Sequence, residues 1–265
     1  MARRLMSWSR NARAFVCALT LYAVAVPTVV AQEAVVDATK MVVPEEDYRS
    51  LKWWHPLAAS AGIALLFTLD KPIHDFWQDN QSETLDDVAN FMKKFKEPVI
   101  FAVSSVGAMS LGLMIDDPKL AQTGLQIFGA YALSSGMMIT TKWAFGRSRP
   151  ADTPDDHLNF DWFGGDENSS FPSGSAAVVF SLAATVSDAV ENTWVTVGLY
   201  SGAVLNSWSR VYSERHWFTD VALGALYGIT AAKIVNGRWR IFGWRPPTVI
   251  VEPGGRASLL YGVEF

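Results

Sequence analysis

Residues 209–220 read Ser-Arg-Val-Tyr-Ser-Glu-Arg-His-Trp-Phe-Thr-Asp and lie between two apolar runs, 194–211 and 216–235. The length and composition of both runs predict helices. His216 is expected to open the second helix, with Asp220 four residues later over the same helix face. A carboxylate in this place can accept a hydrogen bond from one imidazole nitrogen, which fixes the tautomer and leaves the other nitrogen free to attack.

Arg210 closes the first of these helices and can reach back across the short turn toward His216. A guanidinium there can bind an anion at two oxygens. The combination is typical of a histidine nucleophile that faces a phosphate group. A salt-bridged helix start would give the same spacing, so the stretch needs support from the rest of the chain.

Two further motifs supply that support. Residues 142–150 read Lys-Trp-Ala-Phe-Gly-Arg-Ser-Arg-Pro at the end of a third apolar run, and residues 171–175 read Phe-Pro-Ser-Gly-Ser at the start of another. The first motif offers cations that can converge on an anion. The second opens a helix, where backbone N–H groups and the helix dipole favour negative charge. Taken alone, the second motif would be explained equally well by a plain helix N-cap.

In this order the three motifs resemble the signature of the type 2 phosphatidic acid phosphatase superfamily, which includes lipid phosphate phosphatases, bacterial acid phosphatases and haloperoxidase relatives. That signature is a lysine, six residues and Arg-Pro; then Pro-Ser-Gly-His; then Ser-Arg, five residues, a histidine, three residues and an aspartate. The first and third motifs match at every defining position. The second ends at Ser175, where the family has histidine.

The resemblance implies a metal-independent phosphatase without cofactors that forms a phosphohistidine intermediate. In that scheme His216 attacks phosphorus and Asp220 holds the imidazole. The phosphate-binding residues are then Lys142, Arg149, Ser173, Gly174 and Arg210. The family histidine at the position of Ser175 protonates the leaving oxygen, so this step is left open. His157, in the loop between the first two motifs, is the other candidate on the leaving-group side.

Six apolar runs predict core helices at 57–69, 98–115, 119–145, 172–190, 194–211 and 216–235. The first is short and ends at Asp70-Lys71-Pro72, and the amphipathic segment 73–97 predicts a surface helix beside the bundle. The long acidic loop 151–171 is expected to be a lid or substrate rim, with a metal site as the less favoured alternative. Thr248–Val251 and Ser258–Phe265 predict a β-hairpin. We therefore expect an all-α fold, a six-helix bundle of the phosphatidic acid phosphatase type, with a small C-terminal β-hairpin.

The chain start is typical of a secretory signal, because arginines precede an apolar stretch. We expect residues 1–31 to be a signal peptide, with an uncleaved anchor helix as the alternative. A polar arm over 32–52, a phosphatase-like helical domain over 53–245 and a hairpin tail over 246–265 complete the expected organisation. The one cysteine, Cys17, falls in the predicted signal, so disulfides and cysteine-based zinc sites are not expected in the mature chain.

Composition points to a cell-envelope protein. Half of the 265 residues are hydrophobic and 11 are tryptophan, which suits a membrane or membrane-associated protein. The net charge of −4 gives no reason to expect nucleic acid as a partner. The basic residues of 238–245 conflict with a simple count of six membrane spans, so we expect the site to face the periplasm.

These observations predict a bacterial envelope enzyme that hydrolyses lipid phosphates or diphosphates, or another phosphate ester. Two alternatives stay open. One is a non-catalytic member that binds phosphate or phospholipid, which the serine at 175 motivates. The other is a soluble periplasmic acid phosphatase. The sequence leaves the oligomeric state open.

Overall fold

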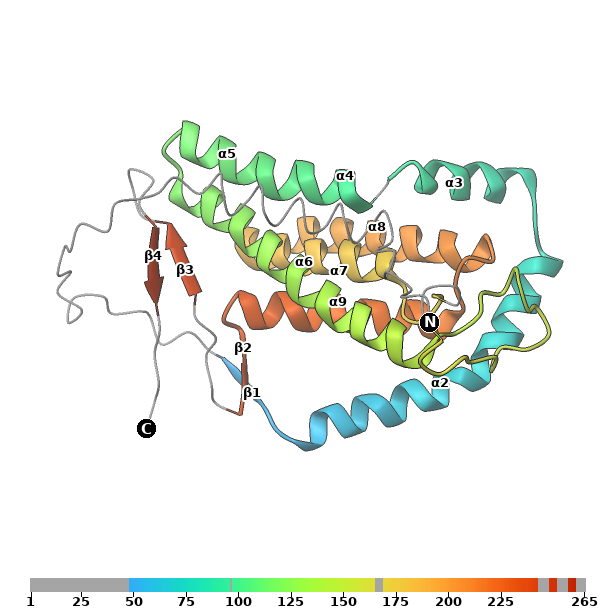
Figure 1. Ribbon diagram of the computed structural model, residues 1–265. Helices are drawn as coiled ribbons and strands as arrows, with labels where there is room; N and C mark the ends of the chain where they lie inside the picture. The colour runs from blue at the N-terminus through green and yellow to red at the C-terminus, as the bar shows by residue number, and fades with distance from the viewer. Residues whose placement is uncertain (1–47, 96, 165–168, 243–247, 252–256, 261–265) are drawn as a thin grey trace, which may run out of the picture. The chain divides into compact units, whose positions relative to one another are not determined.

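The computed structural model describes residues 48–95, 97–164, 169–242, 248–251 and 257–260 (Figure 1). The predicted signal peptide lies outside these residues, as does the predicted arm up to residue 47. The helices are α2 (Trp54–Asp79), α3 (Glu83–Lys93), α4 (Glu97–Phe101), the π-helical η2 (Ala102–Val106), α5 (Gly107–Met114), α6 (Pro118–Phe145), α7 (Gly174–Val190), α8 (Thr193–Tyr212) and α9 (Phe218–Val235). The strands are β1 (Arg49–Leu51), β2 (Trp239–Ile241), β3 (Thr248–Val251) and β4 (Ala257–Leu260).

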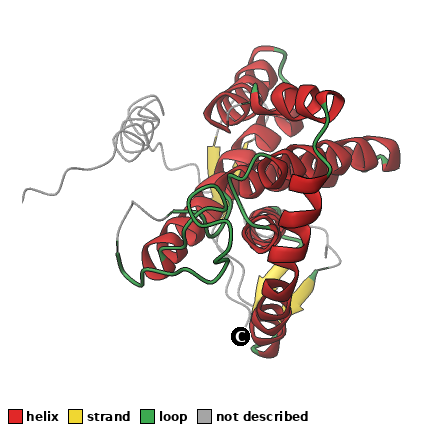
Figure 2. Ribbon diagram, turned by 90° about the vertical axis from the view of Figure 1, so that its right-hand side faces the viewer, coloured by secondary structure: helices red, strands yellow, loops and turns green. Residues whose placement is uncertain are grey.

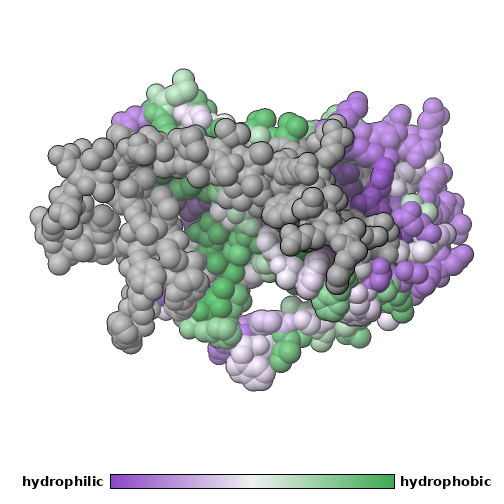
Figure 3. All heavy atoms as spheres, viewed as in Figure 1, coloured by the Kyte–Doolittle hydropathy of each residue, from purple (hydrophilic) through white to green (hydrophobic). Residues whose placement is uncertain are grey.

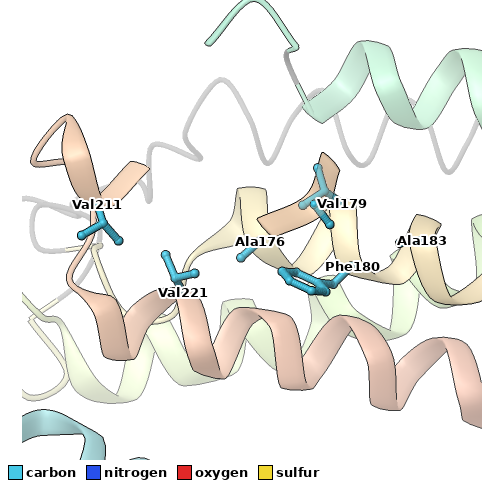
Figure 4. Close-up of a cluster of buried hydrophobic side chains, with 7 residues drawn as sticks. Ala176, Val179, Phe180, Ala183, Val211 and Val221 are labelled. Carbon is cyan, nitrogen blue, oxygen red and sulfur yellow. The ribbon is translucent and has the colours of Figure 1, made fainter. Parts of the chain in front are cut away.

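Helix α7 is the centre of the bundle and packs against α6, α8 and α9. Its approach to α9 is close because α9 carries glycine where the helices meet. A Cβ atom at Gly224 or Gly228 would lie 2.3 Å from the carbonyl oxygen of Ser173 or Ala177, respectively. Small residues at such positions let helix backbones approach each other. Apolar side chains of α7, α8 and α9 fill the neighbouring space, among them Ala176, Val179, Phe180, Ala183, Val211 and Val221 (Figure 4).

The chain direction brings the three motifs to one end of the bundle. The C-terminal ends of α6 and α8 and the N-terminal ends of α7 and α9 lie at this end (Figure 1). Figure 2 views the molecule from this side, with loop segments in front of the helices. A hydrogen bond of 2.8 Å from the Ser173 N–H to the Asp220 carbonyl ties the second motif to the third.

The predicted all-α class is confirmed, and α6, α7, α8 and α9 match the predicted runs to within two residues. The predicted end of the first helix near Pro72 is wrong, because α2 continues to Asp79 with this proline inside it. Proline removes one backbone donor from the helix. We attribute the continuation to Asp70, whose carboxylate is held by Arg147 and Thr219. The predicted 73–97 helix is likewise divided, and Ser82 caps the start of α3.

The hairpin of β3 and β4 is present, with Thr248 opposite Leu260. The parallel pair of β1 with β2 was not predicted, because three-residue strands leave too little periodicity in a sequence. Strand β1 occupies the last residues of the predicted polar arm.

Many apolar side chains face outward. Examples are Leu57, Leu65 and Leu69 on α2, Leu111, Leu113 and Met114 on α5, and Trp194, Val197 and Val204 on α8. Among the described residues, α2 and α9 are long and apolar enough to cross a bilayer. Hydrophilic residues gather on the visible surface at the right-hand end of the view, the end to which α3 belongs (Figure 3).

Candidate active site

His216 lies in the connection between α8 and α9, two residues before α9 begins and not inside the helix as expected. Its Nδ1 atom is 2.8 Å from the carbonyl oxygen of Ser170 and 3.5 Å from Oδ2 of Asp220. A carbonyl oxygen can only accept a hydrogen bond, so Nδ1 carries the proton and Nε2 keeps its lone pair. The structure thus gives His216 the tautomer that a nucleophilic Nε2 requires, with a backbone carbonyl as the nearest partner.

The protonation state of His216 is set by burial. Burial of the imidazole lowers the pKa of His216 below its ordinary value of 6.5, because the charged form loses solvation. Asp220 acts in the opposite direction, whereas Lys142 and Arg149 add to the lowering. The neutral imidazole is therefore the favoured form at neutral pH.

Asp220 is fully buried and is the third residue of α9. Its carboxylate accepts hydrogen bonds from Nη1 of Arg147 at 2.7 Å, from the backbone N–H of Trp217 at 2.8 Å and from the hydroxyl of Ser170. The bond to Trp217 is half of a capping box, which satisfies a free N–H at the helix start. Asp220 therefore holds His216 chiefly through its two neighbours, Ser170 and Trp217.

Ser170 joins the motifs, although it belongs to none of them and lies near the end of the predicted loop 151–171. Its N–H donates to the carbonyl of Arg147 at 2.9 Å. Its carbonyl accepts from His216 and, at 3.5 Å, from Nζ of Lys142, which also donates to the carbonyl of Ser169. Burial lowers the pKa of Lys142 to about 8. The lysine of the first motif thus supports the segment that orients His216.

A pocket of about 310 Å³ lies beside His216 and is lined by Lys93, Arg149, Ser175, Arg210, Arg215 and His216. Arg149, Ser175 and Arg210 come from the three motifs, so the structure brings all three to one cavity. Lys93, at the end of α3, and Arg215 come from outside the motif-defining positions. Four basic side chains around one pocket favour an anionic ligand with several charges.

Three other predicted residues have partners that the sequence did not reveal. Ser173 is fully buried; its hydroxyl accepts from the N–H of Ala176 at 3.4 Å, and its own N–H is used by Asp220. We expected that N–H to meet phosphate, but in the structure it links α7 to α9. Gly174, the first residue of α7, follows directly. His157 lies outside the set that lines the pocket: its carbonyl accepts from Nε of Arg147 at 3.0 Å, and its ring is 6.1 Å from that of Trp217.

Arg147 lies within the first motif but is not one of its defining residues, and it is fully buried. Its Nη2 atom donates to Oδ2 of Asp70 at 2.6 Å, in addition to the bond from Nη1 to Asp220. The rings of Phe67, Phe160 and Trp217 surround the guanidinium, at 4.8 to 5.4 Å from its central carbon. Asp70 was missed because it ends an apolar run that carries no motif. Within the described part of the chain, no group of three or more His, Cys, Asp or Glu residues is placed to hold a metal ion.

Residues 123–247 match the family model of the PAP2 superfamily. Over this segment the chain is similar to the PAP2 superfamily. The family resemblance predicted from the three motifs is thereby confirmed. A lipid A 1-phosphatase of Porphyromonas gingivalis is 32% identical over 110 residues, which are 41% of this chain and 21% of that relative. This chain therefore matches about one fifth of the relative's length.

Two solved structures are similar to this chain. One is a transmembrane PAP2 type phosphatidylglycerolphosphate phosphatase from Bacillus subtilis. Its TM-score is 0.52, with 19% identity, and the match covers 69% of this chain and 95% of that one. The other is Aquifex aeolicus LpxE, with a TM-score of 0.49 and 23% identity over 63% of this chain and 93% of that one. The former similarity supports a shared helical fold.

Proposed function

We propose that this protein is a phosphatase that hydrolyses phosphate esters or diphosphates of lipids in the pocket beside His216. The observation that carries the proposal is the hydrogen bond from Nδ1 of His216 to the Ser170 carbonyl, which leaves a basic Nε2 at a pocket lined by four cations. The similarity of 110 residues to a lipid A 1-phosphatase supports a phosphorylated lipid as substrate.

The proposed reaction has two steps. Nε2 of His216 attacks phosphorus, an N–P bond forms, and the P–O bond to the leaving group breaks with its electron pair on oxygen. Arg149 and Arg210 line the pocket and offset the charge on the phosphoryl oxygens. Water then attacks phosphorus, the N–P bond returns its electrons to Nε2, and the proton of the water passes to solvent. The chain's own side chains supply this chemistry.

The leaving group narrows the substrate class. Ser175 lines the pocket where the family histidine is expected, and a serine hydroxyl is too weak an acid to protonate an alkoxide. A phosphate that leaves from a diphosphate is already a stable anion and needs no proton. Lys93 and Arg215 line the same pocket and can bind such a second phosphate. We therefore propose a preference for diphosphates and activated esters over simple alkyl monoesters.

The proposed location is the bacterial cell envelope, with the protein attached to the membrane and the pocket on the periplasmic side. The outward apolar side chains of α2, α5 and α8 support contact with lipid. Such contact would place a lipid substrate next to the bundle. The signal peptide predicted over residues 1–31 agrees with export, and remains part of this proposal.

A second candidate is a member that binds phosphorylated lipid without turnover, which the position of Ser175 in the pocket favours. The two are separated by measuring phosphate release from lipid monophosphates, lipid diphosphates and soluble esters with protein purified in detergent. We expect release that is abolished in His216→Ala and retained in the control His55→Ala, a substitution near the start of α2. Binding of these compounds without any release would support the second candidate and contradict the first.

A further inference from the structure

Two carboxylates share one guanidinium in the interior beneath the pocket. Asp70, Arg147 and Asp220 are all fully buried, and the two ion pairs measure 2.6 and 2.7 Å. The three side chains belong to α2, the loop after α6, and α9. Asp70 thus lies outside residues 123–247, the segment that matches the PAP2 family model.

Asp70 also holds the first turn of α9. Its Oδ1 atom accepts from both the N–H and the hydroxyl of Thr219, each at 2.7 Å. Thr219 precedes Asp220 directly and follows His216 by three residues. One side chain therefore fixes the guanidinium that binds Asp220 and the backbone from which Asp220 projects.

The charges in this group leave a negative balance next to His216. One arginine between two carboxylates gives a sum of −1, and Oδ2 of Asp220 is 3.5 Å from Nδ1 of His216. When Nε2 bonds to phosphorus, the imidazole gains positive charge, which a buried negative charge stabilises. Without Asp70, Arg147 would neutralise Asp220 and this stabilisation would be lost.

We propose that Asp70 is a positioning residue for His216, which acts through Arg147 and Asp220 to orient the imidazole and to stabilise its charged state. The predicted effect of Asp70 on catalysis rests on the proposed function, whereas its predicted effect on the titration of His216 does not. The other charged groups around His216 are Lys142 of α6 and the pocket residues Arg149, Arg210 and Arg215. All of these are cationic, so Asp70 and Asp220 supply the negative charge.

The test is the titration of His216, followed by NMR of histidine-labelled protein, which has four histidines. Asp70→Asn should lower the midpoint of His216 by about 0.5–1 pH unit, because a negative charge is removed. The matched control is Asp188→Asn, which breaks a 2.5 Å ion pair between α7 and Lys233 of α9. That change should leave the His216 midpoint in place. Equal midpoints in wild type and Asp70→Asn, or equal shifts in both variants, would overturn the proposal.

Kinetics then separate positioning from stability. Asp70→Asn should lower kcat about tenfold or more and move the acid limb of kcat/KM to lower pH, whereas a structural role would reduce only the folded fraction. If the single variant does not fold, the double variant Asp70→Asn, Arg147→Gln keeps the local charge at −1. Its His216 midpoint should lie at or above the wild-type value, and a lower midpoint would contradict the electrostatic account. The titration needs no activity, so inactive wild-type protein would refute the proposed function without deciding this inference.

Discussion

Replacement of Arg147 by methionine should destabilise the protein by about 3–5 kcal/mol, because it leaves buried charge without a partner. The guanidinium is fully buried and pairs with Asp70 at 2.6 Å and with Asp220 at 2.7 Å. Methionine fills similar volume but leaves both carboxylates inside the bundle without a cation. A loss of this size is a large share of a typical total stability of about 5–15 kcal/mol.

Thermal unfolding in detergent, followed by tryptophan fluorescence, measures this effect. For a chain of this size the loss should lower the unfolding midpoint by about 6–20 °C. The matched control is Arg238→Met, since Arg238 pairs with Glu191 at 2.9 Å but the two side chains are 33% and 70% exposed. Such a pair contributes about 0–1 kcal/mol. Adding Asp70→Asn to Arg147→Met should restore part of the stability, because it removes one of the two unpaired buried carboxylates. Equal midpoints for Arg147→Met and Arg238→Met would refute the reasoning.

Three further predictions concern the reaction and its location. Ser175→His should raise kcat for alkyl monoesters by about 10²-fold or more while changing that for esters with good leaving groups much less; equal effects on both would mean that another residue supplies the proton. In the pH profile of kcat/KM, the acid limb should lie below pH 6.5, because burial lowers the pKa of His216 and activity needs its neutral form. The alkaline limb should lie near the pKa of Lys142, about 8. An acid limb above pH 6.5 would contradict this assignment. A cysteine at Asp152, in the loop after α6, should react with an impermeant thiol reagent in intact spheroplasts. Reaction only after lysis would place the site in the cytoplasm.

The sequence predicted the helices and the meeting of the motifs because both depend on local patterns. Apolar runs of helical length predicted α6 to α9. The family motifs predicted that Arg149, Ser175 and Arg210 lie together, and all three line one pocket. The course of α2 through Pro72 was not predictable from local rules, because a distant arginine and threonine hold Asp70 there.

The missed site residues have a common physical cause. Ser170 orients His216 through its backbone carbonyl, and a carbonyl has no sequence signature. Lys93 reaches the pocket from a surface helix that lies far from the motifs in sequence. The backbone N–H of Ser173 was expected to bind phosphate, but it donates to the carbonyl of Asp220. This hydrogen bond depends on the close packing of α7 on α9 at Gly224. Each of these contacts is set by tertiary packing.

The most direct test of the account is to trap the phosphoryl group on the protein. Purified protein is mixed with a substrate labelled in the phosphate, quenched in alkali, where phosphohistidine survives, and mapped by peptide mass spectrometry. We predict label on His216 that is lost on brief acid treatment and is missing in His216→Ala. Label on any other residue, or turnover of substrate that persists in His216→Ala, would contradict the central claim.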